Sequence, residues 1–272
     1  MDISFSQLIQ YDFMQKAFLA GSFVAVACST LGLFLVLRNM SLIGDGLSHV
    51  SFGALALGIF LGWYPTYVAV PVVVLGSYLI LKISQKTGVY GDTAIGIVSS
   101  VAIASGVILA SLSRGFNVDL LSYLFGSILA VSWGEVWVSL FLSLFVLGFV
   151  IVRYWDLFAV TFDEEYAKVS GVRTEAMNTL LVALTAIVVV LAVKVVGVML
   201  VSALLILPAV SALQIAPSFS RAFLYAGTFA VLSVFLGVIG SFFLDVPTGA
   251  TIVAINVSIF TFLVAVRRIF LS

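Results

Sequence analysis

Residues 41–61 read SLIGDGLSHVSFGALALGIFL, an apolar segment interrupted by one aspartate and one histidine. About 20 mostly apolar residues are enough for a helix to cross a bilayer, so this segment predicts a membrane-spanning helix. On such a helix Asp45 and His49, the only histidine of the chain, project from the same face. An aspartate within a membrane costs about 2.5–3.5 kcal/mol on insertion scales, so an ionisable residue there normally lines a polar pathway. We therefore interpret Asp45 and His49 as functional residues.

The composition of the whole chain is that of an integral membrane protein. Of its 272 residues, 63% are hydrophobic and 9% are charged, whereas about 25% are charged in soluble domains. The formal net charge is zero, so no nucleic-acid partner is expected. The single cysteine, Cys28, cannot form an internal disulfide and is interpreted as a small buried hydrophobe. We expect one all-α domain over residues 1–272, a polytopic helical bundle surrounded by membrane lipid.

Apolar runs of spanning length predict eight or nine transmembrane helices. The candidate spans are residues 17–37, 41–61, 65–82, 93–112, 134–152, 176–193, 195–215, 222–243 and 249–266. The count stays open because Lys194 alone separates the sixth run from the seventh. We interpret Lys194 as the tip of a tight hairpin whose ammonium group snorkels to the membrane interface. The amphipathic run 118–132 is too short to span and is predicted to be re-entrant or to lie on the surface.

Basic residues give the orientation, because short cytoplasmic loops collect Lys and Arg. When the loop after the first span is placed inside, nine basic residues fall inside and three outside. The inner set is Arg38, Lys82, Lys86, Arg153, Lys168, Arg173, Arg221, Arg267 and Arg268, and the outer set is Lys16, Arg114 and Lys194. We therefore expect the N-terminus outside, the C-terminus in the cytoplasm, and the polar loop 154–175 on the cytoplasmic side.

Asp45 and His49 have the chemistry of metal ligands, since carboxylate and imidazole both bind divalent transition metals. At a rise of about 1.5 Å per residue, both are expected in the inner half of the membrane. Two ligands leave such an ion under-coordinated. Either other helices supply the rest, or a two-fold axis brings a second copy of the pair, giving two Asp and two His. A buried Asp–His hydrogen bond in a membrane scaffold is the alternative from residue chemistry.

The loop 154–175 contains FDEEYAKVSGV at residues 162–172. Asp163 can cap a short helix, and the two glutamates that follow suit the positive N-terminal end of that helix. Gly171 can end it. The sequence therefore predicts a short, capped cytoplasmic helix.

Three apolar side chains of this helix are expected to share one face, at positions i, i+4 and i+7: Phe162, Tyr166 and Val169. Such a face predicts a docking site for a cytoplasmic partner. A helix lying on lipid headgroups is the alternative, although its excess of acidic residues disfavours it.

Sequence motifs of several enzyme classes are absent. The chain has no G-x-x-x-x-G-K-[ST] phosphate loop, no H-E-x-x-H and no G-x-S-x-G. We therefore expect a protein that is not an enzyme and does not bind ATP through a phosphate loop.

From about residue 17 to 268 the sequence resembles the zinc/manganese permease family of ABC importers. The segments that carry the resemblance follow in the family's order: LGLFLVLRNMSLIGDGLSHVSFGALALG (31–58), VDLLSYLFGSILAVS (118–132), FDEEYAKVSGV (162–172), VVGVMLVSALLILPA (195–209) and DVPTGA (245–250). The second and third segments are more similar to the zinc permeases than to the manganese permeases.

The resemblance implies a homodimeric permease of the cytoplasmic membrane that docks two ATPase subunits on its inner face. An extracytoplasmic metal-binding protein would deliver the ion to its outer face. Asp45 and His49 would bind the transported Zn²⁺ or Mn²⁺, and the chain would hold no cofactor of its own. The segment that would contact the ATPase, the coupling helix, includes Phe162, Asp163, Glu164, Glu165, Tyr166, Ala167 and Gly171.

Other functions remain open at this point. An importer of manganese or iron would have the same architecture. An ion-coupled secondary carrier would use Asp45 as a proton or sodium site, and a permease for siderophores or cobalamin would carry a larger cargo without metal ligands in the membrane.

Overall fold

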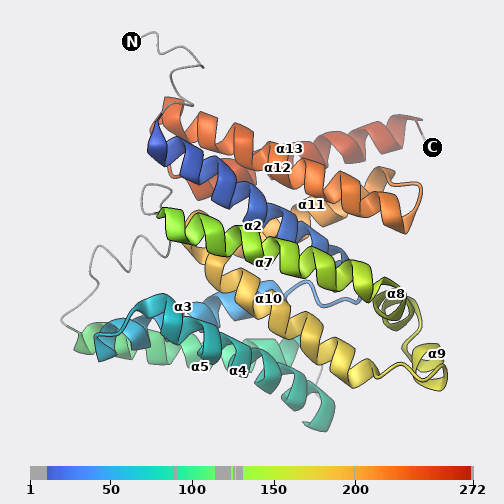
Figure 1. The fold of residues 1–272 in the computed structure, drawn as a ribbon, viewed down its shortest axis with the longest axis horizontal. Coiled ribbons are helices and arrows are strands. Elements are labelled where there is room, and N and C mark those ends of the chain that lie inside the picture. Colours follow the sequence, from blue (N-terminus) through green and yellow to red (C-terminus); the bar gives the residue numbers. More distant parts are fainter. Residues whose placement is uncertain are drawn as a thin grey trace.

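The computed structural model of the chain describes residues 11–87, 91–113, 124, 126, 131–198 and 200–270, and every regular element in these ranges is a helix (Figure 1). The helices are α2 (Asp12–Leu37), α3 (Ile43–Leu61), α4 (Pro65–Thr87), α5 (Gly91–Leu112), α7 (Trp133–Val152), α8 (Tyr154–Phe162), α9 (Glu164–Val169), α10 (Thr174–Val196), α11 (Val201–Ile215), α12 (Phe219–Leu244) and α13 (Thr248–Phe270). The predicted all-α bundle is confirmed. The segment 118–132 falls outside the described residues, apart from Leu124, Gly126, Val131 and Ser132.

Among the described residues, eight helices are long and apolar enough to cross a membrane: α2, α3, α4, α5, α7, α10, α12 and α13. The ninth apolar helix, α11, has only 15 residues. Its axis nevertheless runs along the bundle with the others (Figure 1). The predicted range of eight or nine spans therefore narrows to eight full-length helices plus one shortened helix.

The predicted break at Lys194 is wrong. Helix α10 continues through Lys194 to Val196, and the chain turns at Gly197, whose φ of 92° is available to glycine at little cost. Lysine is a good helix former, so its charge alone does not end a helix. The predicted span 195–215 is thus divided between the end of α10, a short connection and α11.

The ammonium group of Lys194 has a partner on another helix. Its ammonium group forms an ion pair with Glu135 of α7, and both side chains are only 19% exposed. The Tyr64 hydroxyl donates to the same carboxylate at 3.5 Å. A carboxylate on another helix is thus a partner of this lysine, and the ammonium group is largely covered by protein.

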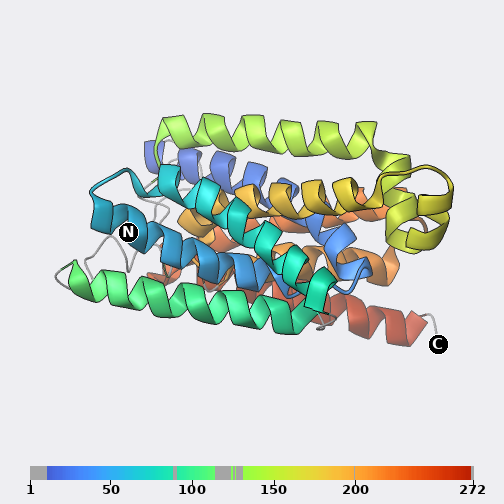
Figure 2. The same ribbon diagram turned by 90° about the horizontal axis from the view of Figure 1, so that it is seen from below.

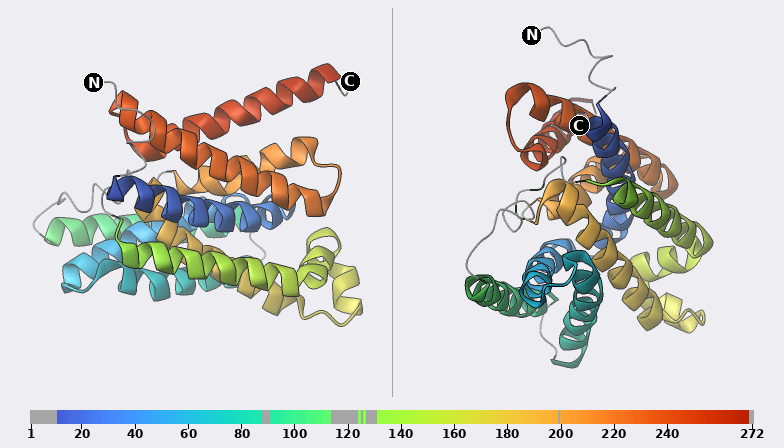
Figure 3. Two further views of the ribbon diagram at one scale, coloured as in Figure 1. Left: turned by 45° about the horizontal axis from the view of Figure 1, so that its top comes forward. Right: turned by 60° about the vertical axis from the view of Figure 1, so that its left-hand side comes forward.

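The spans fall into two groups with a shared centre. Helices α3, α4 and α5 pack together on one side, and α11, α12 and α13 on the other. Helices α2 and α10 lie between the two groups, as the right-hand view of Figure 3 shows. The deepest helices are α2 and α3, each 72% buried over its apolar window.

Glycines bring α2, α3 and α11 into close contact. A Cβ atom on Gly32 of α2 would lie 1.9 Å from the carbonyl oxygen of Leu205, and one on Gly44 of α3 would lie 2.5 Å from the Leu205 side chain. Only glycine fits at position 32, because the clash there is with a backbone oxygen, whereas the end of the Leu205 side chain could move away from a residue at position 44. Helices α2 and α3 thus both meet α11 at Leu205, and Asp45, in the first turn of α3, lies next to this contact.

Helices α8 and α9 lie together at one end of the bundle (Figures 1 and 2). Helix α2 begins at the opposite end, and α13 ends on the same side as α8 and α9. The described chain thus starts and finishes at opposite ends of the bundle.

Candidate metal site and coupling segment

Asp45 and His49 lie on one face of α3, as predicted. The His49 Nε2 atom is 3.5 Å from the Asp45 Oδ2 atom, and the side chains are 30% and 48% exposed for His49 and Asp45. A charge-assisted hydrogen bond between such groups is about 2.7–2.9 Å long. The two side chains therefore lie near each other at a separation longer than a closed hydrogen bond, and both remain partly exposed.

The two residues lie on an open strip of α3. Leu42, which precedes the helix, is 49% exposed. The neighbours on other faces, including Leu47 and Ser48, are completely buried. Beyond His49 the strip closes at Phe52, which is 6% exposed. A carboxylate and an imidazole are thus presented together at the starting half of the helix.

Within the described part of the chain, no three His, Cys, Asp or Glu side chains lie close enough together to hold a metal ion. Among the residues that the structure describes, one copy of the chain therefore brings one carboxylate and one imidazole to the candidate site.

The segment after α7 forms two short helices rather than one. Helix α8 ends at Phe162, the backbone of Asp163 is extended (φ −152°, ψ 94°), and α9 starts at Glu164. The Asp163 carboxylate accepts a hydrogen bond from the backbone N–H of Tyr166 at 2.9 Å, which confirms the predicted cap. Gly171, with φ of 85°, confirms the predicted end.

The expectation that Phe162 shares a helix face with Tyr166 and Val169 is wrong, because the extended Asp163 separates them. All three side chains are nevertheless exposed, at 56%, 64% and 89%, whereas Ala167 is fully buried. Large apolar groups exposed on a short polar segment are typical of an interaction surface.

A cluster of aromatic rings fixes this segment to the bundle. The Phe158 and Phe162 rings of α8 each lie 5.5 Å from the Phe219 ring of α12, and Phe219 lies 5.6 Å from Phe34 of α2. The Tyr154 hydroxyl is 2.8 Å from that of Ser220. We did not predict this cluster, although aromatic residues every four positions along α8 were a signal for it.

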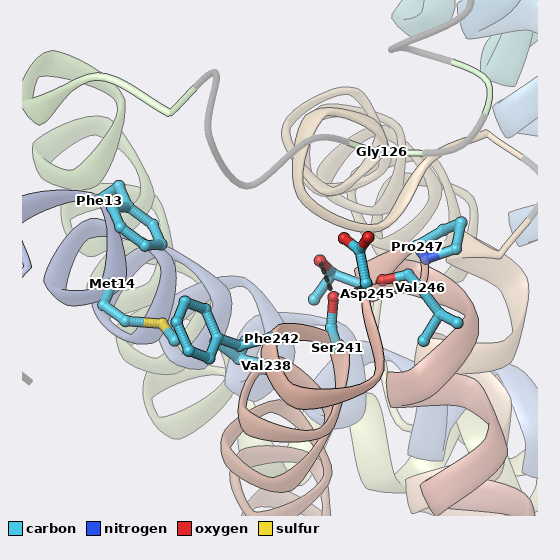
Figure 4. Close-up of a pocket in the computed structure, with 10 residues that line it drawn as sticks. Phe13, Met14, Gly126, Val238, Ser241, Phe242, Asp245, Val246 and Pro247 are labelled. Atoms are coloured by element: carbon cyan, nitrogen blue, oxygen red, sulfur yellow. Dashed lines mark hydrogen bonds between the residues drawn. The ribbon is translucent and has the colours of Figure 1, made fainter. Parts of the chain in front are cut away.

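A separate cavity of about 340 Å³ lies at the other end of the bundle, between the start of α2, the end of α12 and the start of α13 (Figure 4). Asp245 contributes a carboxylate to its lining. The hydroxyls of Ser241 and Thr248 are 2.9 Å apart and bond to each other. The cavity is thus distinct from the open strip on α3.

Comparison with known proteins identifies the family of the chain. The model of the ABC 3 transport family matches residues 10–267. The chain belongs to the ABC 3 transport family. The permease is 36% identical to the "Manganese transport system membrane protein MntC" of Halalkalibacterium halodurans, over 94% of this chain and 88% of the relative. It is 30% identical to the "High-affinity zinc uptake system membrane protein ZnuB" of Haemophilus influenzae, over 92% and 96%.

A solved structure agrees with the sequence comparisons. The permease matches a chain of "PsaBC from Streptococcus pneumoniae in complex with Fab" with a TM-score of 0.86 and 31% identity, covering 95% of this chain and 93% of that one. The resemblance stated from the motifs is confirmed. The protein is a multi-pass permease subunit of a metal ABC importer, a transporter rather than an enzyme, and ATP hydrolysis belongs to a separate subunit.

Proposed function

We propose that the permease moves zinc into the cell along a pathway lined by Asp45 and His49. The observation that carries the proposal is their arrangement: two metal-ligand side chains share one face of α3, 3.5 Å apart, and both remain partly exposed. The family assignment favours an importer over the ion-coupled carrier and the scaffold.

A second copy of the chain would complete the site. Two α3 helices around a two-fold axis would present two carboxylates and two imidazoles, a set that suits tetrahedral Zn²⁺. The same ligands bind Zn²⁺ more tightly than Mn²⁺ in the general order of divalent-metal affinities. Manganese is the second candidate, because relatives named for either metal match the chain, the one named for manganese at 36% identity and the one named for zinc at 30%.

We assign one kind of partner protein to each end of the bundle. Two ATPase subunits would dock on the exposed apolar and acidic groups of α8 and α9, and an extracytoplasmic metal-binding protein would deliver the ion at the opposite end. The bias of basic residues supports this orientation, with α2 starting outside and α13 ending in the cytoplasm. The opposite positions of these two helix ends agree with it.

Metal-stimulated ATP hydrolysis by the reconstituted permease–ATPase complex tests the choice of ion. We expect half-maximal stimulation at a free Zn²⁺ concentration at least about tenfold lower than for Mn²⁺, since this ligand set follows the general affinity order. The assay uses chelator-buffered metal and the metal-binding protein of the same system. Stimulation by Mn²⁺ at the lower concentration would assign the permease to manganese. If neither metal stimulates hydrolysis, the proposed import of these metals is wrong.

A further inference from the structure

Arg38 is a buried cation to which neither the metal pathway nor the docking surface assigns a role. It follows the last residue of α2, and its side chain is only 9% exposed. Burial lowers the pKa of its guanidinium and the nearby Glu164 raises it, but an arginine stays protonated at physiological pH in either case. A permanent charge inside a protein is costly unless it is paired. An apolar residue would fill this position at lower cost.

The partner of Arg38 is the first residue of α9. The Arg38 Nη2 atom lies 3.9 Å from Glu164 Oε2, while Glu164 Oε1 lies 3.0 Å from Lys168 on the exposed side of the same helix. A closed guanidinium–carboxylate hydrogen bond measures about 2.8 Å. The Arg38–Glu164 contact is therefore within electrostatic reach but open by about 1 Å, so a small shift of α9 toward α2 closes it.

A compact turn joins Arg38 to the metal residues. Asn39 has φ of 55°, the Met40 N–H donates to the Leu35 carbonyl at 2.8 Å, and the Ile43 N–H donates to the Met40 carbonyl at 3.1 Å. Helix α3 starts at Ile43, and Asp45 lies in its first turn. A displacement at Arg38 is therefore passed to the first turn of α3 instead of being absorbed by a loose loop.

The last turn of α2 is also linked to α8 by aromatic rings, with Phe219 of α12 between them. Phe34 is completely buried, and its ring meets Phe219, which in turn contacts Phe158 and Phe162 of α8. Packed rings resist movement, whereas the open ion pair can tighten or lengthen. The packed rings therefore act as a fixed hinge between α2 and α8, and the Arg38–Glu164 ion pair acts as an adjustable link between α2 and α9.

We propose that the Arg38–Glu164 contact transmits the position of α9 to the α2–α3 turn, and thereby couples the ATPase to Asp45 and His49. Arg38 is a positioning residue that does not touch the metal. The inference rests on the proposed function, because it takes α8 and α9 as the ATPase docking site and Asp45 with His49 as the pathway. A demonstrated energetic coupling is the evidence that such a link requires.

The test measures metal uptake per ATP hydrolysed by the permease–ATPase complex in proteoliposomes. Arg38→Met should fold at least as stably as the parent, because it removes a buried charge and leaves Glu164 paired with Lys168. It should nevertheless lower uptake per ATP by about tenfold, within the usual range of coupling between sites. Arg38→Lys should restore part of the loss, because an ammonium can approach Glu164 without forming the guanidinium fork. The same Arg→Met change at the exposed Arg221 of α12 is the matched control.

Glu164→Gln removes the carboxylate that pairs with Arg38. Because Glu164 is about half exposed, this variant tests the same contact even if the Arg38 variant assembles poorly. It should lower uptake per ATP similarly, and the double variant should lose no more than the worse single variant, since both remove one contact. If the double variant's loss of uptake per ATP equals the product of the two single losses, the inference is overturned. It is also overturned if Arg38→Met or Glu164→Gln keeps the uptake per ATP of the parent. If Asp45→Asn blocks uptake while these variants behave as the parent, only the coupling inference fails. If Asp45→Asn transports normally, the proposed pathway itself fails.

Discussion

His49→Ala should reduce metal uptake at least about a hundredfold while leaving the permease folded, because loss of a direct ligand exceeds the 10–100-fold cost of losing an outer-shell partner. The change removes the imidazole nitrogen without adding a charge. Asp45→Asn should have a comparable effect, since it preserves the shape of the side chain but removes the anionic oxygen. Uptake of radiolabelled metal by cells with matched permease levels measures both.

Ser51→Ala provides the control on the same helix. The Ser51 hydroxyl is buried and has no hydrogen-bond partner among the described residues, so its removal leaves none of them unsatisfied and should not change uptake. Near-parental uptake by both His49→Ala and Asp45→Asn would remove these residues from the pathway. Equal losses in all three variants would point to general damage to α3.

Replacing Glu164 and Glu165 together by lysine should lower recovery of the ATPase subunit with the permease by at least about tenfold. The change reverses two charges in the first turn of α9, where the helix dipole favours acidic groups, and opposes the electrostatic match with a partner. Co-purification of the ATPase with tagged permease is the measurement, and metal uptake should fall with it.

Asp92→Lys makes the same kind of charge reversal in the first turn of α5 and should leave ATPase recovery unchanged. Full recovery and normal uptake with the α9 variant would instead make α9 a helix that rests on the membrane surface. The exposed Phe162, Tyr166 and Val169 would then face lipid headgroups.

The sequence was sufficient for the helical bundle because a membrane leaves the backbone few choices. Every N–H and C=O group within the bilayer must be satisfied internally, so a long apolar run becomes a helix. The segment 41–61, for example, is helical over Ile43–Leu61. The start and the end of α9 also followed local rules, because the cap at Asp163 and the end at Gly171 were predicted from residue type.

Features that depend on distant partners were not predictable. Lys194 was interpreted as the tip of a hairpin because it alone separates two apolar runs, whereas the fold supplies Glu135 from another helix as its partner. The Arg38–Glu164 contact and the rings around Phe219 likewise join segments far apart in the chain. Asp45 and His49 could be paired in advance because helical periodicity places them together.

X-ray absorption at the zinc edge, on purified permease loaded with one Zn²⁺ per two chains, tests the central claim most directly. The account predicts a bound ion with only nitrogen and oxygen neighbours at about 2.0–2.2 Å, lost in the Asp45→Asn, His49→Ala double variant. Cys28 is completely buried, so sulfur should not contribute. An unchanged spectrum in the double variant, or a sulfur shell near about 2.3 Å, would contradict a metal site formed by Asp45 and His49.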